Sequence, residues 1–114
     1  MAGKILVLVE DLFFLSRIEE TARLLGIAVQ AVHPDTLPAR LADASAVMVD
    51  LNHPLALDAL RTLKSLPESA PVIGFVSHVQ TDLIAAARAA GCDEVMARSA
   101  FTRKLPELLQ QYNK

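Results

Sequence analysis

Five short apolar runs, each followed by a segment with helical periodicity, constrain the fold of this 114-residue chain most strongly. The runs lie at residues 5–9, 27–32, 46–49, 72–76 and 94–97. Most are filled by aliphatic and β-branched residues without polar alternation, which is typical of strands buried on both faces of a parallel sheet. Strands that alternate with helices predict such a sheet with helices packed on both of its faces.

The first helix is predicted from an apolar stripe that Gly26 ends. The stripe consists of Leu15, Ile18, Ala22 and Leu25, which share one face at helical spacing. Glycine is the residue that most often stops a helix, because it adopts the left-handed conformation without strain.

Further helices are predicted at about residues 55–66, 81–90 and 103–112, with a short one among the prolines that ends near Asp43. In the last helix we expect Thr102 to be the N-cap. We expect Pro106 in or near the first turn, where a proline ring is tolerated.

These elements predict a flavodoxin-like (βα)5 three-layer sandwich with a parallel sheet of order 2-1-3-4-5. Connections between parallel strands are right-handed, which limits the topologies that this order of elements can form. In such sheets, ligands bind at the carboxyl ends of the strands, near the point where the strand order reverses. The whole chain, residues 1–114, is expected to form a single domain.

Composition excludes several classes of function. The formal net charge is −2, and no basic stretch is longer than Arg103-Lys104, so nothing indicates a nucleic-acid partner. A lone cysteine, Cys92, allows no internal disulfide and suits a reducing compartment. No signal peptide and no membrane-length apolar stretch is visible, so we expect a cytoplasmic protein that does not bind membranes.

Three carboxylates are predicted to meet at the functional edge of the sheet. Glu10 and Asp11 end the first strand, and Asp50 ends the third, which is its neighbour in the predicted order. Three close anions repel one another unless a cation neutralises them, and oxygen ligands of this kind suit Mg²⁺. The alternative is that each acidic residue caps the helix that follows it, as Asp11 is placed to do.

Three segments resemble the receiver domains of bacterial two-component response regulators. They are residues 4–11 (KILVLVED), 47–54 (VMVDLNHP) and 71–91 (PVIGFVSHVQTDLIAAARAAG), and the resemblance extends over almost the whole chain. It implies that Asp50 is the phosphoacceptor, that Glu10 and Asp11 bind Mg²⁺, and that Asn52 adds its main-chain carbonyl to the metal. It also implies a histidine kinase or another signalling protein as partner, and a homodimer as an available state.

The chain departs from the receiver pattern at three positions. Val76 stands where receivers carry threonine or serine, and Ser77, one residue later, is the candidate for a hydroxyl near the site. The usual lysine is replaced by Arg98 in one register and by Ser99 in another, and arginine keeps the charge without matching an ammonium group. Val95 takes the place of the switch aromatic.

Phe13 and Phe14 are more apolar than the small or polar residues that receivers often carry there. Because the predicted stripe of the first helix does not use them, they could cover the acidic site, form a contact patch or pack against a loop. His33, His53 and His78 lie near strand ends without a zinc-binding spacing, and we expect solvated loop histidines.

Three functional hypotheses follow. The chain is a receiver that accepts a phosphoryl group at Asp50, an atypical receiver-like module that acts through protein contacts without phosphorylation, or a flavodoxin-like domain that binds a small ligand. The first two share a role in phosphorelay signalling and imply no enzyme beyond stoichiometric autophosphorylation from a phosphodonor. The third lacks any recognisable cofactor motif.

Overall fold

The computed structural model describes residues 3–40, 44–65, 70–77 and 80–113. It contains one parallel sheet in the order β2-β1-β3-β4-β5, which confirms the predicted topology. The strands are β1 (Lys4–Leu8), β2 (Val29–Ala31), β3 (Ala44–Asp50), β4 (Val72–Val76) and β5 (Glu94–Ala97). The helices are α1 (Leu12–Leu25), α2 (Leu37–Arg40), α3 (Ala56–Ser65), α4 (Thr81–Ala89) and α5 (Arg98–Tyr112).

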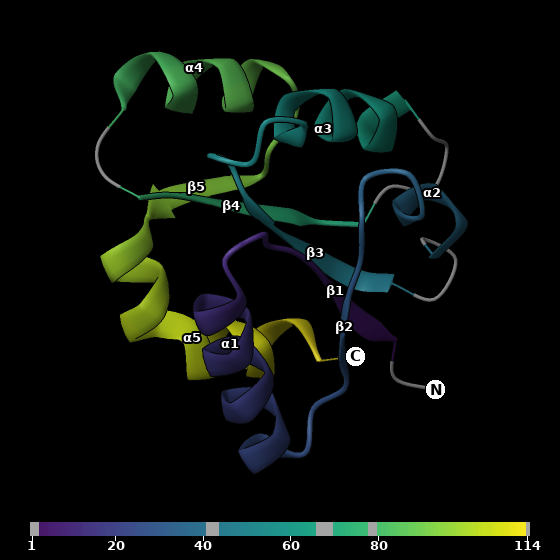
Figure 1. The fold of residues 1–114 in the computed structure, drawn as a ribbon, viewed down its shortest axis with the longest axis vertical. Coiled ribbons are helices and arrows are strands. Elements are labelled where there is room, and N and C mark those ends of the chain that lie inside the picture. The colour runs from purple at the N-terminus through teal and green to yellow at the C-terminus, as the bar shows by residue number, and fades with distance from the viewer. Residues whose placement is uncertain (1–2, 41–43, 66–69, 78–79, 114) are drawn as a thin grey trace.

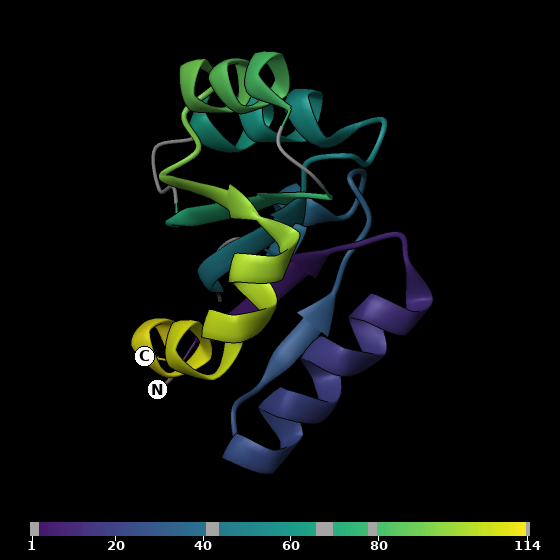
Figure 2. The same cartoon turned by 90° about the vertical axis from the view of Figure 1, so that its left-hand side faces the viewer.

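The sheet is the middle of three layers. Helices α1 and α5 lie on one face, and α3 and α4 lie on the other (Figures 1 and 2). Side chains alternate along each strand, so Ile5 and Val7 pack toward α1 and α5, whereas Leu6 and Leu8 belong to the core under α3. In the described part of the chain, no helix is both long and apolar enough to cross a membrane.

Each observed strand end lies within two residues of its predicted position. Helix α3 begins one residue later than predicted. The predicted ends of the second and third helices, Asp43 and Leu66, lie outside the described residues.

Helix α1 buries two residues of the predicted stripe and adds one that the prediction left out. Its buried residues are Phe14, Ile18 and Ala22, whereas Leu25 is 37% exposed. Gly26 ends the helix in the left-handed conformation, with a φ of 71°, as predicted. The prediction that Phe14 was surplus to the core is therefore wrong, because the helix begins at Leu12 and rotates this ring onto the sheet.

Helix α5 begins five residues earlier than predicted, directly after β5. Its N-cap is Ala97, which has no capping side chain, so the prediction of Thr102 as N-cap is wrong. Thr102 lies inside the helix, where its hydroxyl donates a 2.9 Å hydrogen bond to the carbonyl of Arg98. Pro106 is also inside the helix rather than in its first turn, which leaves the carbonyl of Thr102 without the usual amide donor.

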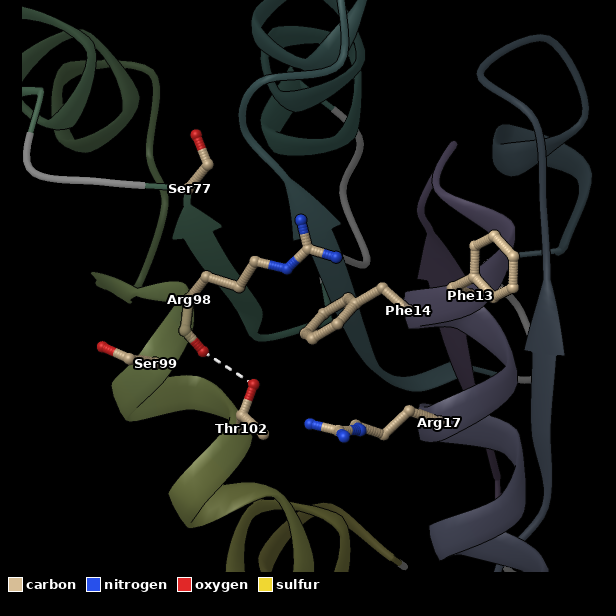
Figure 3. A pocket seen from close by; sticks show the side chains of 7 residues that line it. All are labelled: Phe13, Phe14, Arg17, Ser77, Arg98, Ser99 and Thr102. Carbon is tan, nitrogen blue, oxygen red and sulfur yellow. Dashed lines mark hydrogen bonds between the residues drawn. The ribbon is translucent and has the colours of Figure 1, made fainter.

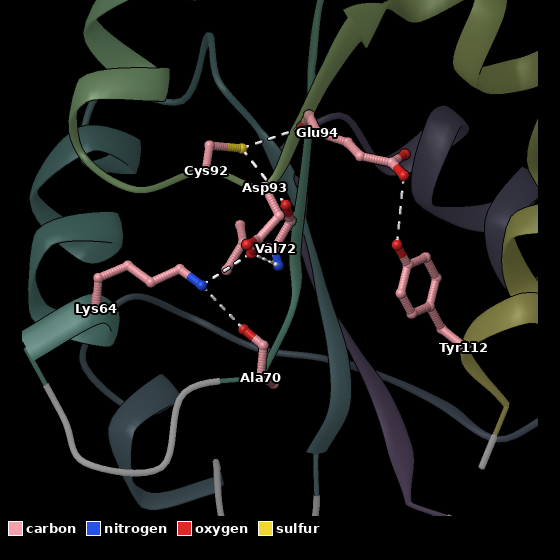
Figure 4. Close-up of polar contacts among 7 residues, drawn as sticks. All are labelled: Lys64, Ala70, Val72, Cys92, Asp93, Glu94 and Tyr112. Carbon is pink, nitrogen blue, oxygen red and sulfur yellow. Dashed lines mark hydrogen bonds and ion pairs between the residues drawn. The ribbon is translucent and has the colours of Figure 1, made fainter.

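A polar cluster joins α3 to the amino-terminal ends of β4 and β5 (Figure 4). Lys64 Nζ donates to Asp93 Oδ2 at 2.8 Å and to the carbonyl of Ala70 at 3.3 Å. The same Asp93 oxygen accepts the amide of Val72 at 2.7 Å. This cluster fixes the sheet at the edge opposite to the three carboxylates, with Cys92 buried beside it.

Candidate functional site

Three carboxylates lie at the carboxyl ends of two adjacent strands. Glu10 and Asp11 follow β1, Asp50 ends β3, and these strands are paired up to Leu8 and Val49. All three carboxylates line one open cavity of about 510 Å³, here called the acidic pocket, together with Asn52, His53 and Pro54. The tertiary structure therefore brings together the predicted phosphoacceptor, Asp50, and the three residues that the receiver resemblance assigned to a metal.

Asp50 has the most buried carboxylate of the acidic pocket. Burial raises its pKa, and this outweighs the lowering effects of the Asn52 amide, Arg98 and His53. The Asn52 amide donates to Asp50 Oδ1 at 2.9 Å. The backbone of the β3–α3 connection thus orients this carboxylate from one side.

Both carboxylate oxygens of Asp11 have hydrogen-bond partners. Oδ1 accepts the amides of Phe13 at 3.0 Å and Phe14 at 3.2 Å, which makes Asp11 the N-cap of α1. Oδ2 accepts Arg98 Nη2 at 2.8 Å. The hydrogen bond from Arg98, followed by the one from Phe14, lowers the pKa of Asp11.

Glu10 is the exposed member of the pocket, with 70% of its side chain accessible. Its Oε2 lies 3.8 Å from His53 Nε2, whose ring is only 14% exposed. His53 Nδ1 accepts the amide of Leu55 at 3.0 Å, so in the neutral ring the proton is on Nε2 and faces Glu10. The expectation of a solvated loop histidine is therefore wrong for His53; His33 is exposed as expected, and His78 lies outside the described residues.

Arg98 is the first residue of α5 and reaches across the end of the sheet to Asp11. Its guanidinium carbon lies 3.9 Å from the centre of the Phe14 ring. A guanidinium stacks on aromatic faces and binds carboxylates in its plane, and Arg98 does both. Of the two registers open from sequence, the structure directs Arg98 to the carboxylates, whereas Ser99 is exposed.

A second cavity, of about 490 Å³, lies on the other side of Arg98 (Figure 3). It is lined by Phe13, Phe14, Arg17, Ser77, Arg98, Ser99 and Thr102. Phe13 is 92% exposed and borders this cavity rather than the acidic pocket. Phe14 instead packs against Phe75 and Phe101, with ring centres at 5.1 and 5.9 Å.

Ser77 follows β4, and its amide donates to Asn52 Oδ1 at 2.8 Å. Asn52 Nδ2 in turn donates to Gln80 Oε1 at 2.7 Å, so the Asn52 side chain links the loops after β3 and β4. The hydroxyl of Ser77 points away from the Arg98 guanidinium (Figure 3). Sequence reasoning missed Gln80, because no local pattern marks a contact across 28 residues.

The two valines at the switch positions lie on the α3 and α4 side of the sheet. Val76 is 0% exposed and belongs to the core on that side. Val95 is half-buried and packs against the same core. Neither side chain carries a group that could bond to a phosphoryl oxygen.

The acidic pocket fits a divalent cation in its chemistry but not in its arrangement. Carboxylate oxygens are the donors that Mg²⁺ prefers. However, both oxygens of Asp11 already have partners, and in the described part of the chain no group of three His, Cys, Asp or Glu side chains is arranged to hold a metal ion. A cation that used Asp11 would compete with Arg98 for it.

At the level of sequence, no protein-family model and no curated protein matches the chain. Its structure is similar to a response regulator from Thermotoga maritima, with a TM-score of 0.77 and 17% identity, over 98% of both chains. The beryllofluoride-activated receiver domain DrrB matches with a TM-score of 0.79 and 17% identity, over 98% of this chain and 97% of that one.

A third similar structure is the manganese-bound form of the response regulator Rcp1. The TM-score is 0.71 and the identity 16%, over 96% of this chain and 90% of that one. These three structures are receiver domains or response regulators that the chain covers almost completely, and the TM-scores establish a shared fold. The chain has the flavodoxin-like receiver-domain fold of the response regulators.

Proposed function

We propose that this chain is a receiver-type signalling domain that accepts a phosphoryl group on Asp50 and acts through contacts with other proteins. The observation that carries the proposal is the position of Asp50, half-buried at the end of β3 and next to Glu10, Asp11 and Arg98. An acidic residue held back from solvent among other acidic residues is costly for stability, which favours a functional role. The partner that would supply the phosphoryl group is a histidine kinase or another phosphohistidine-bearing signalling protein.

The proposed step is the transfer of one phosphoryl group per chain. An ionised Asp50 oxygen attacks the phosphorus of a phosphohistidine, a P–O bond forms and the P–N bond breaks. The imidazole leaves with the electron pair of the broken bond and takes up a proton. The charge of Arg98 acts on Asp50, and its fork of N–H donors suits the added phosphoryl oxygens.

Mg²⁺ stays a prediction from the receiver resemblance, supported by the metal-bound state of a similar structure. If it binds, Glu10, Asp11, Asp50 and the Asn52 carbonyl are the proposed ligands, and it would supply positive charge beside the incoming phosphoryl group. Because Asp11 is paired with Arg98, we assign no step of the transfer to a metal.

A second proposal is an interaction module of the same fold that does not respond to phosphorylation. The position of Val76 favours it, because a fully buried valine offers no hydroxyl to a phosphoryl group. Val95 supports it in the same way, since an aliphatic side chain there provides no ring to move between an inner and an outer position. In this case the acidic pocket contributes to binding, and partner affinity does not depend on phosphate.

Intact-protein mass spectrometry after incubation with an acyl phosphate and Mg²⁺ tests the first proposal. We expect one phosphoryl group per chain, none in Asp50→Asn, and an unchanged yield in Asp58→Asn, whose aspartate is exposed on α3 away from the pocket. Equal labelling of the wild-type chain and D50N would refute Asp50 as acceptor. Absence of labelling in folded wild-type protein, under conditions that label a typical receiver, would favour the second proposal.

A further inference from the structure

A positive charge of the chain itself contacts one carboxylate of the acidic pocket. Arg98 Nη2 lies 2.8 Å from Asp11 Oδ2, and Arg98 also lowers the pKa of Asp50 by its charge. A guanidinium keeps its charge at every pH that proteins encounter. The repulsion among Glu10, Asp11 and Asp50 is thus relieved in part without any bound ion.

Arg98 is held in this position by more than its ion pair. Its guanidinium stacks over Phe14, which is buried against the sheet beneath it. The side chain of Arg98 is 30% exposed, so water screens the pair only in part. The contact with Phe14 limits the motion of the arginine. Pairing with Asp11, whose side chain is 40% exposed, therefore costs it less conformational entropy than pairing costs a free surface arginine.

Only one of the two oxygens of Asp11 is available to a cation without the loss of a helix cap. Oδ1 accepts two amides at the start of α1, and removing it would uncap that helix. Oδ2 is therefore the oxygen that a metal could use, and it is the one that Arg98 binds. Two cations in contact with one oxygen repel each other, so a divalent ion and Arg98 compete for Oδ2.

We infer that Arg98 is the built-in counter-ion of the acidic pocket, and that it competes with a divalent cation for Asp11 and so weakens metal binding there. The biological meaning of the inference rests on the proposed receiver function, in which a cation would assist phosphoryl transfer. The physical claim concerns metal affinity alone and is tested without phosphorylation. It predicts that this arginine makes the domain a weak metal binder.

Manganese titration followed by backbone NMR tests this inference, because Mn²⁺ broadens the signals of nearby amides. The variants are Arg98→Gln, which removes the counter-ion, and Arg103→Gln, which removes the same charge from an exposed position of the same helix. We expect R98Q to bind Mn²⁺ about fivefold more tightly than the wild type, because the ion no longer competes with the guanidinium for Asp11 Oδ2. R103Q should bind like the wild type.

The broadening should centre on residues 10–12 and 50–53 in R98Q and disappear in the double variant R98Q with Asp11→Asn. A metal-dependent melting temperature in R98Q, absent or smaller in the wild type, is the second readout. Arg98→Lys keeps the charge and loses the planar stack on Phe14, so it should bind Mn²⁺ more tightly than the wild type even if R98Q does not fold.

Equal or weaker Mn²⁺ affinity in the arginine variants would overturn the inference, as would an equal gain in R103Q. These outcomes are independent of the proposed function. Labelling of Asp50 by an acyl phosphate can persist while the arginine variants show no gain, in which case only the inference fails. Conversely, R98Q can gain metal affinity in a chain whose Asp50 is never labelled, in which case only the phosphoacceptor proposal fails.

Discussion

Arg98 Nη2 donates a 2.8 Å hydrogen bond to Asp11 Oδ2, although 87 residues separate the two along the chain. The bond joins the first residue of α5 to the N-cap of α1, whose carboxylate lines the acidic pocket. It therefore links the packing of α1 against α5 to the charge of the candidate site. The Asp11 carboxylate caps α1, pairs with Arg98 and lines the acidic pocket. Substitutions of Asp11 can separate these roles.

Comparing Asp11→Asn with Asp11→Ala separates the cap from the ion pair. Asparagine caps a helix as well as aspartate does but carries no charge for Arg98, whereas alanine does neither. We expect both variants to melt at lower temperatures than the wild type, and D11A to melt at the lower temperature of the two. Thermal denaturation followed by circular dichroism measures this, and equal melting temperatures for D11N and D11A would show that the cap adds nothing.

Replacing Asp50 by asparagine is expected to stabilise the fold. Burial raises the pKa of Asp50 in the folded state, so the folded chain favours the protonated form. The protonated form contributes stability below the unfolded pKa, and that contribution is lost as the pH rises through the folded pKa.

At about pH 7, D50N should therefore be more stable than the wild type by about 1 kcal/mol, as is common when a strained functional residue is removed. The difference should shrink toward about pH 3, where aspartate is protonated in both states. Urea denaturation at the two pH values measures it. A less stable D50N at neutral pH would mean that the Asn52 amide and Arg98 outweigh burial.

Truncation of two adjacent phenylalanines should affect stability to very different extents. Phe14 is 6% exposed and contacts Phe75 and Phe101, so Phe14→Ala should cost about 3 kcal/mol or more of unfolding free energy. Phe13 is 92% exposed, and Phe13→Ser should change stability by less than about 0.5 kcal/mol. Denaturant midpoints of the two variants test this, and a large loss in F13S would place its ring in the core.

Acid should weaken the cluster at the opposite edge of the sheet. Burial alone would raise the pKa of Asp93, but the Lys64 ammonium and the Val72 amide outweigh it and lower the pKa below its ordinary value. A lowered pKa gives stability that is present above the unfolded pKa and is lost as the pH falls through the folded pKa.

Stability of the wild-type chain should thus fall below about pH 4, and Asp93→Asn should lose about 1 kcal/mol at neutral pH, because half-exposed ion pairs contribute little. The control is Asp58→Asn, whose carboxylate pairs with Arg61 on the exposed side of α3. Chemical denaturation across the acid range measures both. A D93N chain that keeps the full acid sensitivity of the wild type would assign that sensitivity to other carboxylates.

Local sequence patterns determined the elements and their order. The apolar runs gave all strands within two residues, and the alternation with helices gave the parallel sheet and its strand order. The reason is physical: strands buried on both faces must be apolar throughout, and right-handed connections leave few ways to join them. The meeting of Glu10, Asp11 and Asp50 followed from that order, because parallel strands end at the same edge.

Only the tertiary structure showed which aromatic ring is buried at the site and which charged residues pair there. Sequence placed Phe14 outside the core and began the last helix at residue 103, since periodicity does not fix where a helix starts or how it is rotated. It offered Arg98 and Ser99 as alternatives, and only the geometry of α5 directs Arg98 to Asp11. Contacts between residues far apart in the chain depend on how helices pack against the sheet, and no local pattern records that packing.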